Sequence, residues 1–218
     1  MLSQLIYGAQ VSLLVGFAAG LLSTIVAVLI GLSWGYMRGF AGEVVGFIVN
    51  LFLVIPGLPL MIVIAAYLQN GGILMIIAVI VVTGWAWGAR VLRSQTQSLR
   101  GNDFVTSAQF SGDSRARIVF REILPNMTSI IAGTLFGAAT AAILAEAGLE
   151  FLGLGDSSIV SWGTMLYWAQ NSNSLLTGQW LLLFAPGLCI ALLALSLTLI
   201  NFGVDGISNP RLREGKGR

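Results

Sequence analysis

The sequence contains no histidine, a single cysteine and few charged residues of either sign. Without histidine, the chain has no imidazole general base, no histidine-ligated metal and no histidine-based catalytic triad. The single cysteine, Cys189, lies inside an apolar run, and no disulfide can form within the chain. Charged residues make up 9% of the 218 residues, which is too few to cover the surface of a soluble domain of this length.

Two signatures are also missing from the sequence. No Gly-x-x-x-x-Gly-Lys-Ser/Thr loop for holding phosphates occurs, so ATP hydrolysis would need another polypeptide. The first apolar run lacks the charged n-region and small-residue cleavage site of a secretory signal peptide, so we expect it to be a permanent span. Clustered nucleophile–base pairs are absent as well. We therefore expect no catalytic residue, no bound cofactor and no metal.

Long apolar runs dominate what is present. Hydrophobic residues make up 56% of the chain and the mean hydropathy is +0.89, as is typical of an integral membrane protein. Runs of roughly 20 residues can cross a bilayer as helices, and we identify five: 11–36, 44–68, 71–89, 127–149 and 180–203. Because the runs are continuous instead of alternating, helices are favoured over a β-barrel. The predicted fold class is all-α, a polytopic membrane protein whose residues 1–218 form one transmembrane domain.

The basic residues predict how the chain is oriented. Arg38 lies between the first two runs, and two larger groups lie between the third and fourth runs and at the C-terminus. These groups are Arg90, Arg93, Arg100, Arg115, Arg117 and Arg121, and Arg211, Arg213, Lys216 and Arg218. The positive-inside rule places all three regions in the cytoplasm, and the links 69–70 and 150–179 then face outward. Five spans with a cytoplasmic C-terminus leave Met1 outside, so we expect a further helix upstream.

The charged interruption over residues 90–125 is predicted as two short helices separated by a turn. Residues 103–109 alternate polar and apolar side chains at helical spacing. Gly112 then breaks the pattern, and Asp113 or Ser114 can cap the helix that follows by accepting a bond from a free backbone N–H.

The second of these helices, over residues 114–124, is amphipathic. Its predicted apolar face consists of Ile118, Phe120, Ile123 and Leu124. Pro125 should end this helix and open the next span, where a first-turn proline loses no helical hydrogen bond. On composition alone, the segment could equally be a basic loop that lies on anionic lipid headgroups.

The stretch TSAQFSGDSRARIVFREILPN resembles the cytoplasmic "EAA" loop of binding-protein-dependent ABC importer permeases. The pattern of that loop is Glu-Ala-Ala, three residues, Gly, nine residues, then Ile-x-Leu-Pro. The EAA positions are taken by Thr106, Ser107 and Ala108, the glycine by Gly112, and the closing Leu-Pro by Leu124 and Pro125. Three further stretches resemble the dipeptide/oligopeptide/nickel branch: LSQLIYGAQVSLLVG, AEAGLEFLGLG followed by SWGTML, and DGISNPRLR. The resemblance extends over essentially the whole chain, and members of this branch have one more span just upstream of LSQLIYGA.

The resemblance implies a permease subunit of an ATP-driven ABC importer. In such permeases the EAA loop forms a coupling helix that docks on a cytoplasmic ATPase, whose closure tilts the permease between inward-open and outward-open states. The implied partners are a second homologous permease subunit, two cytoplasmic ATP-binding subunits, an extracytoplasmic solute-binding protein and membrane lipid, with no nucleic acid. The implied location is the cell membrane of a prokaryote.

The residues that the resemblance assigns to ATPase coupling are Asp103, Phe104, Thr106, Ser107, Ala108, Gly112, Arg115 and Pro125. Small side chains at 106–108 would let the loop lie close to its partner, and Gly112 allows a turn that a Cβ would hinder. Arginines of the second helix could reach acidic groups or carbonyls of the partner. Thr106 replaces the acidic residue of the motif, and Asp103, about one turn earlier, is a candidate substitute.

Two further pairs of residues are candidates for the translocation path. Glu146 and Glu150, four residues apart, share a helix face near the outer end of the fourth run, where a carboxylate needs a partner or water. Glu146 either lines the path or a gate, or it bonds backbone in the turn 153–158 and is structural. Pro56 and Pro59 interrupt helical hydrogen bonding in the second run, as a pore-side hinge or a static kink.

Residues 156–178 are too broken for a full span. We expect a re-entrant or surface-lying outer segment with Trp162, Tyr167 and Trp168 at interface depth. In the family this region faces the solute-binding protein, and an aromatic membrane anchor is the alternative. The Gly-x-x-x-Gly spacings Gly31–Gly35 and Gly35–Gly39 suit close helix packing.

Other functions are less well supported by the sequence. A secondary transporter or channel would predict inverted repeats and charges along an intramembrane pathway, and neither is evident. A membrane enzyme is disfavoured by the missing histidines. For an importer of this branch, peptides are the expected substrate, with oligosaccharides or nickel as alternatives.

Overall fold

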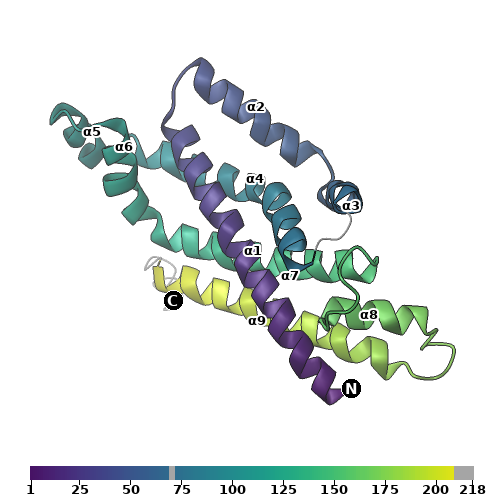
Figure 1. The fold of residues 1–218 in the computed structure, drawn as a ribbon. Coiled ribbons are helices and arrows are strands. Elements are labelled where there is room, and N and C mark those ends of the chain that lie inside the picture. The colour runs from purple at the N-terminus through teal and green to yellow at the C-terminus, as the bar shows by residue number, and fades with distance from the viewer. Residues whose placement is uncertain (69–71, 209–218) are drawn as a thin grey trace.

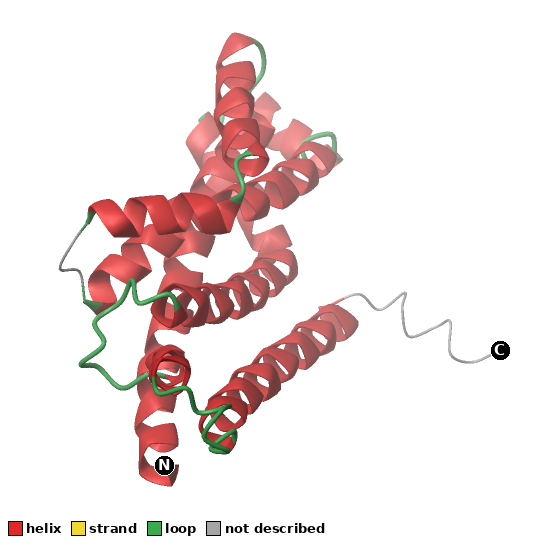
Figure 2. Ribbon diagram, turned by 90° about the vertical axis from the view of Figure 1, so that its right-hand side faces the viewer, coloured by secondary structure: helices red, strands yellow, loops and turns green. Residues whose placement is uncertain are grey.

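The computed structural model describes residues 1–68 and 72–208, and side chains up to Val204. The regular secondary structure of these residues is entirely helical (Figures 1 and 2). Four helices are long and apolar enough to cross a membrane, and a bent pair makes a fifth if it forms one span. The predicted fold class is thereby confirmed. The link at 69–70 and the C-terminal basic residues Arg211, Arg213, Lys216 and Arg218 lie outside the described residues.

Helix α1 (Leu2–Tyr36) is the central element of the bundle. It runs diagonally across α4 (Ile73–Leu99) and α7 (Thr128–Phe151), and packs most extensively against these two helices (Figure 1). One side of α1 is buried against these helices, and its exposed side is mostly apolar too, as expected of a helix that meets lipid there.

Small residues on α1 allow these close contacts. A Cβ on Gly20 would lie 2.6 Å from the Cα of Ala139 on α7, and one on Gly35 would lie 2.5 Å from the Cβ of Thr96 on α4. The close packing predicted for Gly31 and Gly35 is therefore present at the α1–α4 contact. The second spacing is not a packing motif, because Gly39 lies beyond the helix with a φ of 74° and no neighbour within 4 Å.

The second apolar run forms two helices, α2 (Phe40–Val54) and α3 (Gly57–Tyr67), which are bent by 88° relative to each other. Where one kinked span was expected, the structure has a full break. Pro56 directly precedes α3, and Pro59 lies in its first turn, where no intrahelical N–H is required. The two prolines thus start the second helix of the pair.

The segment between α4 and α7 differs in two ways from the expected pair of short helices. First, α4 continues to Leu99, because its basic residues have partners: Arg93 lies 4.0 Å over the ring of Trp34, and Arg90 donates to Asn50 (2.5 Å). Second, the path from Arg115 to Phe151 is one helical stretch of 37 residues.

This path has four parts. They are α6 (Arg115–Arg117), the π-helix η1 (Ile118–Ile123), the 3₁₀ turn η2 (Leu124–Met127) and α7. Pro125, expected to end the helix, lies within the 3₁₀ turn, where its missing N–H is accommodated by the change in hydrogen-bond register.

Two small helices mark opposite ends of the bundle. Helix α5 (Asp103–Phe110) lies with α6 at one end, whereas α8 (Trp162–Asn171) lies near the N-terminus at the other (Figure 1). The last helix, α9 (Leu181–Ser208), packs on α7 and α8. The two candidate sites therefore lie at the two ends of the molecule.

Candidate functional site

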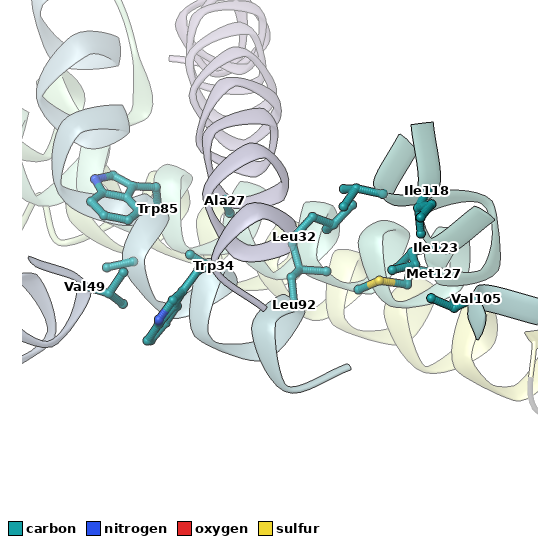
Figure 3. Packing of buried hydrophobic residues seen from close by; sticks show 13 residues of the cluster. Ala27, Leu32, Trp34, Val49, Trp85, Leu92, Val105, Ile118, Ile123 and Met127 are labelled. Carbon is teal, nitrogen blue, oxygen red and sulfur yellow. The ribbon is translucent and has the colours of Figure 1, made fainter. Parts of the chain in front are cut away.

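One face of α5 is anchored to the bundle. Val105 is fully buried in a cluster that includes Leu92 of α4, Ile118 and Ile123 of η1, and Met127 (Figure 3). Phe104 and Ala108 pack against the same cluster. This apolar contact packs α5 on η1, the segment that leads through η2 into α7.

The opposite face of α5 is exposed. Thr106 and Ser107 lie on it, as does Asp103, and Phe110 exposes 88% of its surface. The three EAA positions are therefore divided: the first two face outward and Ala108 faces the cluster. Aromatic side chains are enriched in contact surfaces, so the exposed Phe110 is the residue of this face that indicates one.

A turn at Gly112 joins α5 to the next helix. Gly112 has a φ of 80°, which only glycine adopts without strain, and its N–H donates to the carbonyl of Gln109 (3.1 Å). Of the two predicted caps, Ser114 is the one observed: its hydroxyl accepts from the N–H of Arg117 (3.4 Å). Asp113 instead forms an ion pair with Arg117, with 3.4 Å between the charged atoms.

The buried face of η1 differs from the predicted one. Ile118, Val119 and Ile123 are buried, whereas Phe120 exposes 44% of its surface. A π-helix bonds residue i to residue i+5, so residues five apart share a face. Ile118 and Ile123 therefore point the same way, and the assignment of Phe120 to the apolar face, made from α-helical spacing, was wrong.

Three arginines from separate segments gather next to α5. Arg38, Arg100 and Arg115 line one cavity of about 360 Å³. Arg100 is held in place by donating to the carbonyl of Tyr36 at the end of α1 (3.2 Å). The link after α1 and the loop around α5 therefore lie at the same end of the bundle, as the charge pattern requires.

At the other end, Glu146 is fully buried between helices. Its Oε1 accepts a hydrogen bond from the hydroxyl of Ser12 on α1 (3.2 Å). Ser12 in turn accepts from the backbone N–H of Trp162, the first residue of α8 (3.2 Å). The alternative of a bond to the turn 153–158 is thus not observed; the carboxylate and Ser12 connect α7, α1 and α8.

Glu150 lies one turn further along α7 and is also buried. Its Oε2 accepts a hydrogen bond from the hydroxyl of Ser161, which caps α8 in a reciprocal arrangement with Thr164. A Cβ on Gly163 would lie 2.7 Å from this oxygen, so glycine is required for the close approach. Both carboxylates thus lie at the N-terminus of α8, where the helix dipole favours negative charge.

The aromatic residues of α8 are not equivalent. Trp162 is buried inside the bundle and donates from Nε1 to the carbonyl of Leu5 (3.0 Å), which differs from the interfacial position expected for it. Trp168 exposes 56% of its surface, and Tyr167 is partly buried. Hydrogen bonds from Ser158 lower the pKa of the exposed Asp156 carboxyl in the loop before α8.

Residues 27–214 match the family described as "Binding-protein-dependent transport system inner membrane component". This match covers most of the chain. The chain belongs to that family. The resemblance found in the sequence motifs is thereby confirmed, and the protein is a membrane permease subunit of an ABC transporter.

Several curated permeases are similar over most of their length. The oligopeptide transport system permease protein OppC of Mycobacterium tuberculosis H37Rv is 32% identical over 209 residues, which are 95% of this chain and 70% of the relative. DppC of Bacillus subtilis, a dipeptide transport system permease protein, is 31% identical over 95% of this chain and 64% of its own. The di/tripeptide transport system permease protein DppC of Pseudomonas aeruginosa is 33% identical over 98% of this chain and 69% of its own.

A solved structure has the same fold. The inward-facing MetNI methionine ABC transporter matches with a TM-score of 0.73, over 94% of this chain and 97% of that chain, at 17% sequence identity. This likeness supports the architecture of the permease, since identity at this level indicates fold alone.

Three residues of the candidate sites were not found from the permease sequence. Phe110 gives no signal of an exposed site, because an apolar residue at a helix end is normally part of a core. Ser12 and Ser161 give no sequence signal, since their partners lie 134 and 11 residues away. A search for polar residues on the apolar α1, where a hydroxyl requires a partner, would have indicated Ser12.

Proposed function

We propose that this permease subunit forms half of the transmembrane pathway of an ATP-driven peptide importer, and that residues 103–125 couple it to a separate ATPase. The relatives at 31–33% identity are named as oligopeptide, dipeptide and di/tripeptide permeases, which supports a peptide substrate. Oligosaccharide or nickel import by the same permease type is the alternative. Two ATP-binding subunits, a second homologous permease and an extracytoplasmic solute-binding protein complete the assembly.

The observation that carries the coupling proposal is the two-faced environment of α5. Val105 anchors one face in the cluster around η1, whereas Thr106, Ser107 and Phe110 are exposed on the other. A docked ATPase that displaces α5 would therefore move η1 and, with it, the membrane helix α7 that continues the same helical stretch, because packed side chains transmit displacement. The exposed Phe110 would be the main anchor in the ATPase groove.

The opposite end of the bundle is then the side of the solute-binding protein. Helix α8 and the exposed Trp168 lie there. In this orientation Arg38 and the arginines around α5 are cytoplasmic, as the positive-inside rule predicts. Pro56 and Pro59, at the break between α2 and α3, remain candidates for a part of the pathway that moves, and Glu146 remains a candidate for the outer gate.

Co-purification from membranes tests the coupling proposal. The permease is expressed with its sister permease and ATPase subunits, either as wild type or with Phe110→Ala and Ser107→Arg. Loss of an aromatic anchor at an interface should lower the retained ATPase about tenfold. Phe202→Ala is the matched control, since Phe202 is an exposed phenylalanine outside residues 103–125. Ala108 is left unchanged because it packs inward, so its replacement would test folding instead of docking.

The outcomes separate docking from substrate. Equal retention of the ATPase by wild type and the double variant would show that α5 is not the docking helix. Uptake of a labelled dipeptide into proteoliposomes that contain the whole transporter tests the substrate. Competition by an oligosaccharide or by nickel, but not by other peptides, would exclude the peptide assignment while leaving the coupling result intact.

A further inference from the structure

A cavity between the end of α1 and the loop around α5 is unusually basic for this chain. It measures about 360 Å³, far more than the roughly 30 Å³ that one water occupies in the liquid. Its walls come from separate segments: Arg38 after α1, Arg100 after α4 and Arg115 of α6, together with Tyr36, Gln109 and Asp113. The cavity thus combines three guanidinium groups with one carboxylate.

The positive charge in this cavity is not neutralised within the described part of the chain. The carboxylate of Asp113 is paired with Arg117, which is not a lining residue. Arg100 is fixed by the carbonyls of Gly35 and Tyr36 (3.5 and 3.2 Å), which leaves its charge in place. The side chains of Arg38 and Arg115 form no hydrogen bond or ion pair with any described residue. The cavity therefore offers positive charge that an anion could pair with.

The position of the cavity indicates where that anion comes from. Tyr36 is the last residue of the membrane helix α1, and Arg38 lies two residues further on. A tyrosine followed by an arginine at the end of a span is typical of the level of the lipid headgroups. Basic clusters at this level attract anionic lipids, and the planar guanidinium group pairs with phosphate oxygens.

We propose that the Arg38–Arg100–Arg115 cavity binds the phosphate group of an anionic phospholipid. Arg38 and Arg115, which have no partner among the described residues, pair with the phosphate oxygens, while Arg100, held against the end of α1, adds positive charge. Ile118 provides an apolar wall next to these groups. The lipid then lies between the end of α1 and α5, so this site is separate from the exposed face of α5 assigned to the ATPase.

Native mass spectrometry of the purified permease complex tests the proposal. The complex is delipidated and then mixed with phosphatidylglycerol or phosphatidylcholine, with and without the ATPase subunits. We expect phosphatidylglycerol to be retained in preference, and Arg115→Gln or Arg38→Gln to weaken its binding, together by about tenfold. Arg121→Gln is the matched control, because Arg121 is an exposed arginine of the same segment that does not line the cavity.

Four results would overturn the lipid assignment. Equal retention of the two lipids would exclude recognition of an anionic headgroup. An equal loss of phosphatidylglycerol binding in the Arg121→Gln control would show that binding depends on the overall positive charge and not on this cavity. Complete displacement of phosphatidylglycerol by inorganic phosphate would make a free phosphate the ligand. Loss of the lipid on adding the ATPase subunits would mean that an acidic group of the ATPase occupies the cavity.

Discussion

Ser12 on α1 and Glu146 on α7 are joined by a hydrogen bond of 3.2 Å, although 134 residues separate them in the chain. Ser12 also accepts the first N–H of α8. One hydroxyl group thus holds three helices together at the end of the bundle opposite α5. Each of these groups is buried, so each depends on the others for its hydrogen bonds.

Replacing Ser12 with alanine should destabilise the fold by about 1–3 kcal/mol, because the N–H of Trp162 and a buried carboxylate oxygen lose their partner. The change is measured by thermal unfolding in detergent, with thiol labelling of the single Cys189 as the readout. Ser33→Ala on the same helix is the control, since its hydroxyl bonds to none of the described residues. A melting temperature equal to wild type would show that the bond contributes nothing.

Gly20→Ala should weaken the α1–α7 contact by about 1–3 kcal/mol, as expected for overpacking. The added Cβ would lie 2.6 Å from the Cα of Ala139, which is backbone and cannot rotate away. Gly137→Ala on α7 is the comparison, because no atom lies within 4 Å of its Cβ position. This control should match wild type or exceed it, and equal losses in both variants would contradict the assigned close approach.

Val105→Ala should loosen α5 without unfolding the bundle. The side chain is fully buried, and its truncation should cost about 2 kcal/mol. Because the contact is at the end of the molecule, hydrogen exchange should rise at residues 103–110 and stay unchanged in the membrane part of α7. Thr106→Ala, on the exposed face, should leave the exchange pattern as it is. A global rise in exchange would show that α5 is part of the main cooperative unit.

The two glycines that flank α5 should respond differently to alanine. Gly112 has a φ of 80°, and a side chain there costs about 1–2 kcal/mol. Gly101 has a conformation open to other residues and only one backbone oxygen near its Cβ position, at 3.9 Å. Gly101→Ala should therefore be neutral or stabilise by about 0.4–1 kcal/mol. The melting temperature should fall for Gly112→Ala and should stay equal to wild type or rise for Gly101→Ala. A reversed order would refute the turn.

The carboxyl of Asp156 should titrate below its ordinary pKa, because Ser158 donates to the ionised form through its hydroxyl (2.6 Å) and its N–H (2.9 Å). A lowered folded-state pKa means that this interaction stabilises the protein above about pH 4 and is lost as the pH falls further. Ser158→Ala should raise the pKa towards the ordinary value, as read from the carboxyl carbon resonance. Ser157→Ala is the control and should leave the titration unchanged.

The membrane helices and the turn around Gly112 could be predicted from the sequence for a physical reason. A span needs about 20 apolar residues in a row, and this signal is local. The turn at Gly112 and the cap at Ser114 are local as well, since each depends on residues within a few positions. These features could therefore be predicted from neighbouring residues alone.

The features that the sequence did not reveal depend on tertiary contacts. Arg90 and Arg93 looked like loop residues, but Asn50 and Trp34 give them partners and the helix continues through them. The buried face of η1 could not be predicted because its residues follow the spacing of a π-helix instead of an α-helix. As a result Val119 is buried where Phe120 was expected to be. The partner of Glu146 came from the far end of the chain.

The close contact at Gly20 also has a mechanical consequence for α1. Along the helix, Ser12 lies about 12 Å from this point and Tyr36 about 24 Å from it on the other side, at 1.5 Å per residue. If α1 tilts about Gly20 as a rigid lever, Ser12 and Tyr36 move in opposite directions, and Tyr36 moves about twice as far as Ser12. A small displacement at Ser12 and Glu146 is thereby matched by a larger, opposite one beside α5.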